Sequence, residues 1–99
     1  MRKWDVYLAN VPFEDLPESK KRPVIILGDS VVAVDCLKMT GHPPRRREYQ
    51  LKRWQEAGLM KPTTVRVSKR LCLSPDAFLK KLGSLHPIDI LELQRILSL

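Results

Sequence analysis

Several residue types are scarce in this chain of 99 residues, which has four glycines, two cysteines, two histidines and six Phe, Trp or Tyr residues. No apolar run approaches the roughly 20 residues that a membrane-spanning helix needs, so membrane association is not expected. Asp5 and Asn10 interrupt the basic start of the chain before it could form a secretory signal, and a cytoplasmic location is expected. The composition, 43% hydrophobic and 29% charged, indicates a folded domain rather than a disordered or fibrous chain.

The two cysteines lie in separate apolar runs, Cys36 in VVAVDCL and Cys72 in RLCLS. This placement predicts small reduced core residues rather than a Cys-x-x-Cys site. His42 and His86 are far apart in the sequence, so the spacing of a metal site is absent. No metal or other cofactor is therefore expected.

Positive charge is concentrated in the middle of the chain. Residues 38–70 contain ten Lys or Arg against two acids, whereas the rest of the chain contains eight Lys or Arg against nine acids. A basic segment in an otherwise neutral chain favours a polyanionic partner such as nucleic acid, because neutralised phosphates release counterions. A basic face that only keeps the protein hydrated is the alternative.

A chain of this length is expected to form one domain, residues 1–99. Alternating apolar residues predict a strand over 4–11, and the prolines and charges that follow predict a loop over 12–22. Two β-branched runs separated by Gly-Asp-Ser predict a hairpin of strands 23–27 and 31–39.

The segments after this hairpin mix strand and helix signals. Segment 47–59 predicts a short strand and then a helical turn that ends at Gly58. Segment 63–73 alternates as a strand does, which places Val65 on the core face and points Arg66 away from the core.

Two short helices are expected near the C-terminus. The first, 74–83, has Ser74 as N-cap, Pro75 at its first position and Gly83 after its last turn. The second begins at Pro87 and carries an apolar stripe. About five short strands and two short C-terminal helices predict a mainly β fold of the α+β class, a small barrel or rolled sheet.

Four stretches of the sequence resemble, in order and spacing, the MazF/PemK toxin family, the ribosome-independent endoribonucleases of bacterial toxin–antitoxin systems. They are WDVYLANVPFED, SKKRPVIILGD, VDCLKMTGH and KKLGSLHPIDILELQRILSL. Each stretch is weakly specific alone, but together they extend over nearly the whole chain.

The resemblance implies an SH3-like barrel that forms a homodimer, with a basic active-site groove near the dimer interface. It implies a metal-independent, sequence-specific endoribonuclease. Such an enzyme cuts single-stranded RNA through attack of the RNA's own 2′-hydroxyl and leaves a 2′,3′-cyclic phosphate. It also implies a cognate antitoxin whose acidic tail blocks the groove, and the basic middle of this chain suits that partner as well as RNA.

Three residues match family positions that act in catalysis. Arg22 matches the arginine of the family's Arg-Pro pair, and Pro23 restricts its backbone to extended angles. Thr40 matches a threonine whose hydroxyl can donate to phosphate, although the family's following serine is Gly41 here. Arg66 aligns with a catalytic arginine of some members. Arginine suits this chemistry because its planar fork matches two phosphate oxygens.

The chain departs from the family at the acid of the acid–base pair. Ser68 stands where characterised members carry an aspartate, and a serine hydroxyl is no base near neutral pH. Glu48 is the nearest acid within the basic segment, and His42 has the side chain that titrates near neutral pH. Either could transfer the proton; for His42 the alternative is a structural role as a loop histidine between Gly41 and Pro43. Loss of nuclease activity with retained binding is the remaining alternative.

The stretch TGHPPRRRE predicts a substrate-facing loop in which two prolines limit the backbone and three arginines follow an RNA strand. The RNA-binding candidates are Arg45, Arg46, Arg47, Lys69 and Trp54. Trp54 and Tyr49 could stack on unpaired bases, and core packing is the alternative for both.

Two other classes of function stay open at this stage. One is a non-catalytic nucleic-acid- or partner-binding module on the same barrel. The other is inhibition of a different macromolecule, as in a structurally related toxin family that poisons gyrase. The arginine-rich segment favours RNA over the latter.

Overall fold

A computed structural model describes residues 1–12, 17–29, 34–41, 44, 46 and 48–98, with the backbone alone for residues 29, 34–38 and 40. Its elements are β1 (Asp5–Pro12), β2 (Ser19–Asp29), β3 (Val34–Thr40), β4 (Glu48–Gln50), β5 (Thr64–Leu73), the 3-10 helix η1 (Pro75–Ala77), β6 (Phe78–Ser84) and α1 (Pro87–Leu97).

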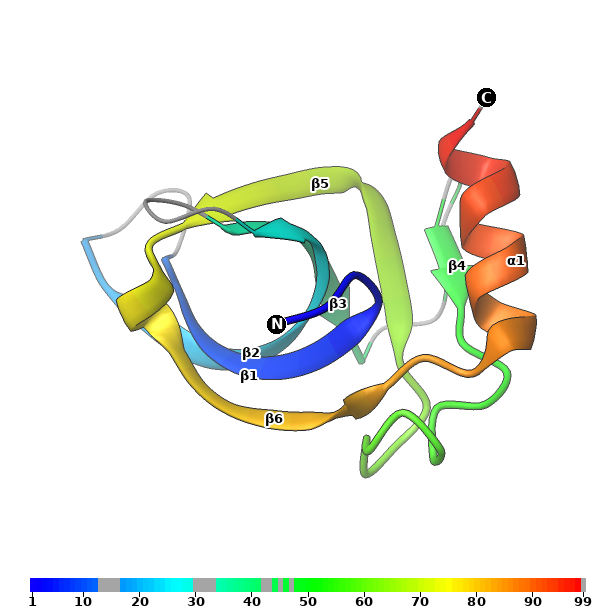
Figure 1. The fold of residues 1–99 in the computed structure, drawn as a ribbon, viewed down its shortest axis with the longest axis horizontal. Helices are drawn as coiled ribbons and strands as arrows, with labels where there is room; N and C mark the ends of the chain where they lie inside the picture. Colours follow the sequence, from blue (N-terminus) through cyan, green and yellow to red (C-terminus); the bar gives the residue numbers. More distant parts are fainter. Residues whose placement is uncertain (13–16, 30–33, 42–43, 45, 47, 99) are drawn as a thin grey trace.

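The six strands of the described residues form one antiparallel sheet in the order β4-β5-β3-β2-β1-β6. The sheet curls strongly on itself, with α1 beside β4 at one end (Figure 1). Register shifts, which bend strands, occur in three of its pairings, for instance between Ile26 and Gly28 of β2. The predicted mainly β, barrel-like fold of the α+β class is thus confirmed.

The core consists of two groups of buried apolar side chains. The larger contains Trp4, Val6, Ile25, Met39, Leu51, Ala57, Val65, Leu85 and Leu93. The smaller contains Ala9, Val11, Val24 and Leu73. Val24 and Ile25 are neighbours in β2 but belong to different groups, so the groups lie on opposite faces of the sheet.

Helix α1 begins at Pro87, as predicted. Nδ1 of His86 accepts a hydrogen bond from the Ile88 N–H at 3.1 Å and so caps the first turn. Leu93 is fully buried in the larger core group, and Ile90 packs against the same group. In the part of the chain that the structure describes, no helix is long and apolar enough to span a bilayer.

The predicted helix over 74–83 is wrong. Ser74 caps only the single turn of η1, accepting a hydrogen bond from the Asp76 N–H at 3.4 Å, and the chain then continues as β6. β6 pairs with the edge of β1 that β2 leaves open. This pairing satisfies a row of main-chain donors and acceptors, which outweighs a helix propensity of a few tenths of a kcal/mol per residue.

β2 is longer than the sequence pattern suggested. It begins at Ser19, so the second part of the predicted loop over 12–22 is strand. The reason is pairing with β1, in which Lys20 lies opposite Val11 and Arg22 opposite Ala9. The pairing of β1 with β2 therefore fixes the backbone position of Arg22.

The outward alternation predicted for β5 is confirmed at its start. Val65 is fully buried, whereas the Arg66 side chain is 36% exposed. The prediction of a core position for Cys72 is wrong, because Cys72 is an exposed free cysteine next to the buried Leu73. The side chain of Cys36 lies outside the described residues.

Two glycines allow the turn after β4 to approach β6 closely. Gly58, predicted to end that turn, has φ 85°, and a Cβ on it would lie 2.0 Å from the Leu82 carbonyl oxygen. A Cβ on Gly83 would lie 2.5 Å from the Ala57 carbonyl oxygen. Gly83, predicted to end a helix, has this packing role instead.

A buried carboxylate ties the start of β1 to β6. Asp5 is 5% exposed, and it accepts hydrogen bonds from the Ser84 hydroxyl at 2.7 Å and the Arg2 N–H at 2.9 Å. The Lys81 ammonium lies 3.5 Å from the same carboxylate. Burial by itself raises the pKa of Asp5, but these hydrogen bonds and the Lys81 charge together lower it below its ordinary value.

We expect Asp5→Asn to lower the free energy of unfolding by about 2 kcal/mol at pH 7, because two hydrogen bonds lose a charged acceptor. Since the folded state lowers the pKa, this contribution is present above the unfolded pKa and is lost as pH falls through the folded one. Urea unfolding from pH 7 down to pH 2 should therefore show the two proteins converging below about pH 4. A difference that stays constant over this range would rule out the charge as its cause.

Candidate nucleic-acid site

A basic pocket of about 210 Å³ opens where the start of β2, the end of β3 and the segment before β5 meet. It is lined by Lys20, Lys21, Arg22, Pro23, Met39, Gly41, Lys61 and Thr63. We call this hollow the basic pocket. It contains Arg22, one of the predicted catalytic residues.

Strand register brings the walls of the basic pocket together. Thr40, the last residue of β3, pairs with Thr64, the first residue of β5, which sets Gly41 beside Thr63. The hydroxyl of Thr63 donates to the carbonyl oxygen of Lys61 at 2.9 Å and holds the segment that carries this lysine. The end of β3 and the segment before β5, which adjoin through this pairing, thus form two walls of the basic pocket, and the start of β2 forms the third.

Gly41 leaves room for the side chain of Lys61. A Cβ on Gly41 would lie 3.1 Å from Nζ of Lys61 and 3.2 Å from its Cε. Where the family commonly has a serine, this chain therefore has a bare backbone with an ammonium group against it.

The charged side chains among the described residues that line the basic pocket all have one sign. They are Lys20, Lys21, Arg22 and Lys61. Among the residues that the structure describes, none of these four cations has an acidic partner. Neighbouring like charges repel one another, so an anion that enters the pocket relieves this repulsion.

Arg66 and Glu48 form a second candidate group, the Arg66–Glu48 pair. The two residues lie opposite each other in the β4–β5 ladder, and Nε of Arg66 donates to Oε2 of Glu48 at 3.2 Å. The Glu48 side chain is 11% exposed and the Arg66 side chain 36% exposed. Lys38 lies opposite Arg66 on its other side, in β3. The pair therefore offers a fixed carboxylate next to a solvent-accessible guanidinium.

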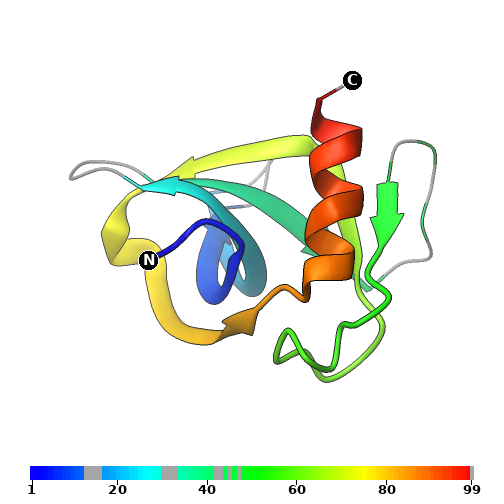
Figure 2. The same cartoon turned by 45° about the vertical axis from the view of Figure 1, so that its right-hand side comes forward.

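A buried aspartate of α1 holds β4 in place. Asp89 is fully buried, and it accepts hydrogen bonds from the Tyr49 hydroxyl at 2.6 Å, the Lys52 N–H at 2.9 Å and the Arg53 N–H at 3.0 Å. Burial, and then the hydrogen bond to Asp89, raise the pKa of Tyr49. Both ribbon views show β4 alongside α1 (Figures 1 and 2). Because Tyr49 follows Glu48 directly, Asp89 also fixes the strand that presents Glu48.

Some of the predicted site residues lie in the candidate groups or in β5, others lie elsewhere, and the side chains of the rest fall outside the described residues. Arg22 lines the basic pocket, Arg66 pairs with Glu48, and Lys69 lies in β5. Arg46 is exposed in the segment before β4, and Trp54 packs against the larger core group. The structure describes only the backbone of Thr40, and His42, Arg45 and Arg47 lie outside the described residues.

Sequence reasoning did not single out Lys20, Lys21, Lys61 or Asp89. The two β2 lysines were interpreted as loop charges, and Lys61 was one of ten basic residues in the middle segment. The Lys61-Pro62 pair before a strand was the one signal available for Lys61. Asp89 looked like an ordinary acid in a first helical turn, which is a common position for one.

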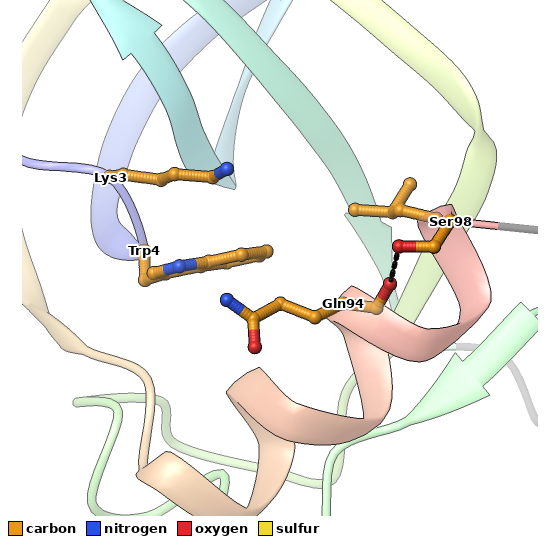
Figure 3. Close-up of a pocket in the computed structure, with 5 residues that line it drawn as sticks. Lys3, Trp4, Gln94 and Ser98 are labelled. Carbon is orange, nitrogen blue, oxygen red and sulfur yellow. Dashed lines mark hydrogen bonds between the residues drawn. The ribbon is translucent and has the colours of Figure 1, made fainter.

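A larger hollow, of about 440 Å³, lies between the N-terminal segment and α1. Lys3 lies over the Trp4 ring, 5.1 Å from its centroid, and Gln94 of α1 and Ser98, the residue that follows α1, also line the hollow (Figure 3). Of the predicted site residues that the structure describes, none lines it. Within the described ranges, His, Cys, Asp and Glu side chains do not gather in threes as a metal site would require.

Comparison with known proteins finds similarity in structure only. No family model and no curated protein matches the sequence. An endoribonuclease from a mycobacterial species, solved in complex with its cognate antitoxin, superposes with a TM-score of 0.76 at 13% identity, over 99% of this chain and 91% of that one. A mycobacterial endoribonuclease gives 0.75 at 13%, over 99% and 88%. The Mycobacterium tuberculosis toxin MazF-mt6 gives 0.69 at 19%, over 95% and 92%. The chain therefore has the fold of MazF-type toxin endoribonucleases.

Proposed function

We propose that this protein is a MazF/PemK-like toxin that cuts single-stranded RNA at specific sequences without a metal ion. The observation that carries the proposal is the basic pocket, in which Lys20, Lys21 and Lys61 surround the family's arginine position, Arg22, and none of the four cations has an acidic partner among the described residues. The backbone of single-stranded RNA can place a phosphate in such a pocket, and each phosphate that the cations neutralise releases counterions. The shared fold with toxin endoribonucleases supports the same conclusion.

The reaction is an internal transfer within the RNA. The 2′ oxygen forms a bond to phosphorus, the bond from phosphorus to the 5′ oxygen breaks, and a 2′,3′-cyclic phosphate remains on one product. Arg22 and Arg66 stabilise the negative charge that develops on the phosphorane oxygens. Glu48, held by Arg66 at 3.2 Å, accepts the proton of the 2′-hydroxyl in place of the family aspartate.

The departing 5′ oxygen must receive a proton. His42 follows Gly41 of the basic pocket in the chain and is the residue that we propose for this step. Thr40, Arg45, Arg46, Arg47 and Lys69 are proposed to bind the RNA backbone. Trp54 is assigned to packing rather than stacking because it lies against the core.

The proposed partners follow from the same charge. An acidic antitoxin segment would compete with RNA for the basic pocket, as one of the structural neighbours was solved with its cognate antitoxin. We further propose a homodimer located in the cytoplasm, where single-stranded RNA is available.

The test is incubation of the purified protein with a long single-stranded RNA in EDTA, followed by mapping of cut sites and end groups. We expect discrete cuts that end in 2′,3′-cyclic phosphate, and a loss of at least about 100-fold in rate for Arg22→Ala, the scale for one lost transition-state donor. Arg95→Ala, which removes one charge from the exposed face of α1, is the matched control and should cut normally.

The competing function is a non-catalytic RNA-binding module, favoured by the exposed Ser68 in place of the family acid. Intact RNA together with salt-sensitive binding would establish that module and exclude the nuclease. Cuts that disappear in EDTA, or that leave a 3′-hydroxyl on one product and a 5′-phosphate on the other, would exclude the proposed mechanism.

A further inference from the structure

We propose that Lys61 is an RNA phosphate ligand and that Gly41 leaves the space through which its ammonium reaches the phosphate. This inference rests on the proposed function, since it assigns the ligand of the basic pocket as a phosphate group of the RNA strand. Lys61 was not among the predicted RNA contacts.

The position of the Lys61 side chain supports the assignment. Its Nζ lies against the backbone of Gly41, so close that a Cβ there would be 3.1 Å away. Both residues line the basic pocket together with Arg22. An anion in the pocket would thus have a guanidinium from β2 and an ammonium from the segment before β5 to contact.

The backbone of Lys61 is also fixed in place. Its carbonyl oxygen accepts the Thr63 hydroxyl at 2.9 Å, and Thr63 itself is only 5% exposed. Pro62 between them restricts the backbone further. The lysine's main chain is therefore fixed, and only its flexible stem must adjust to a ligand.

The hydrogen-bond donors of the basic pocket suit a phosphate group. Lysine supplies a compact point charge with three donors, and arginine a planar fork, a combination that satisfies a tetrahedral group from two sides. The hydroxyl that the family's serine would supply is replaced here by a full positive charge. This exchange predicts a binding affinity more sensitive to salt than a hydroxyl contact would give.

The first experiment measures RNA binding against salt for Lys61→Ala, with Arg95→Ala as the control of equal charge. We expect Lys61→Ala to weaken binding about 10-fold near 0.1 M salt and to reduce the slope of log K against log salt by about 0.7, the value for one phosphate on a single strand. Lys61→Arg should keep the slope. Equal effects of Lys61→Ala and Arg95→Ala would overturn the proposal.

Gly41→Ala tests the second half of the proposal. The far end of a lysine can move at little cost, so the variant should fold, and the absence of a left-handed φ at Gly41 allows alanine. We expect it to weaken RNA binding about 3-fold in the parent and to have no effect in the Lys61→Ala background, because the two changes act on one contact. Additive effects would contradict the coupling.

A probe other than RNA separates this inference from the proposed nuclease. Inorganic phosphate, titrated at constant ionic strength with chloride, should shift the backbone amide resonances of Gly41 and Lys61 in a saturable way that Lys61→Ala abolishes. Phosphate binding without RNA cleavage would support the ligand assignment while the nuclease fails. The opposite result would refute the assignment and still support the nuclease. In that case the protein cuts RNA, phosphate does not shift the amide resonances, and Lys61→Ala has the same slope of log K against log salt as the parent.

Discussion

Replacing Asp89 with alanine is expected to lower the free energy of unfolding by about 3 to 5 kcal/mol, because three donors lose a buried, charged acceptor. The carboxylate is fully buried and accepts three hydrogen bonds, from Tyr49, Lys52 and Arg53. Its removal leaves two backbone N–H groups and a phenol without their acceptor, and each loss of this kind costs about 1 to 3 kcal/mol. For a domain of this size the melting temperature should fall by about 15 °C or more.

Calorimetry or urea unfolding measures this effect, with Glu92→Ala as the control on the same helix. Glu92 contacts Arg95 at the surface, so its loss should change stability by less than about 0.5 kcal/mol. Asp89→Asn, which keeps the shape but loses the charge, should fall between the two. A melting temperature for Asp89→Ala within a few degrees of the Glu92 variant would show that the three hydrogen bonds contribute little.

The Arg66–Glu48 pair gives the largest expected effects on activity. Arg66→Ala should slow RNA cleavage by at least about 100-fold, the scale for removing one donor to a developing oxyanion. Glu48→Gln should slow it by about 100-fold to 10,000-fold, the scale of general base catalysis, while RNA binding changes by less than about 3-fold. In the proposed mechanism Arg66 contacts the charge of the phosphate, whereas Glu48 acts only on the proton, so loss of Glu48 should leave RNA binding nearly unchanged.

Single-turnover cleavage and filter binding on the same RNA measure both quantities. Glu56→Gln, the same chemical change at an exposed acid that contacts Arg53, should be fully active. Arg66→Lys should recover only part of the rate, because an ammonium lacks the planar fork. A Glu48→Gln protein that cuts at the wild-type rate excludes Glu48 as the proton acceptor and leaves His42 as the candidate for that role.

The strands that alternate or contain β-branched runs could be predicted from sequence, because one buried face imposes a period of two. This explains the success at 63–73, where Val65 is buried and Arg66 faces outward, and at the hairpin of β2 and β3. The helix prediction for segment 74–83 was wrong because its local signals, a cap and good helix formers, are weak. The decisive contact, the open edge of β1, lies far away in the chain.

The candidate site was predictable only where a single residue carries its own signal. Arg22 and Arg66 could be selected because each matches a position of the family's motifs, and the outer-face position of Arg66 in its strand agrees with that match. Lys61 and Asp89 could not, since each acquires its role from a residue distant in sequence, Gly41 and Tyr49 respectively. No spacing rule connects such pairs before the sheet has set its register.

The position of β1 in the sheet has a consequence for the order of folding during synthesis. β1 is paired on one side with β2, which follows it closely, and on the other with β6, which ends at Ser84. At ~5 to 20 residues per second, roughly 4 to 14 s separate the synthesis of β1 and β6. Asp89, which anchors β4, is made later still. A ribosome-bound chain therefore carries an open strand edge and an unanchored Glu48 until nearly all of residues 1–89 have emerged, so the proposed nuclease activity should not appear before that point.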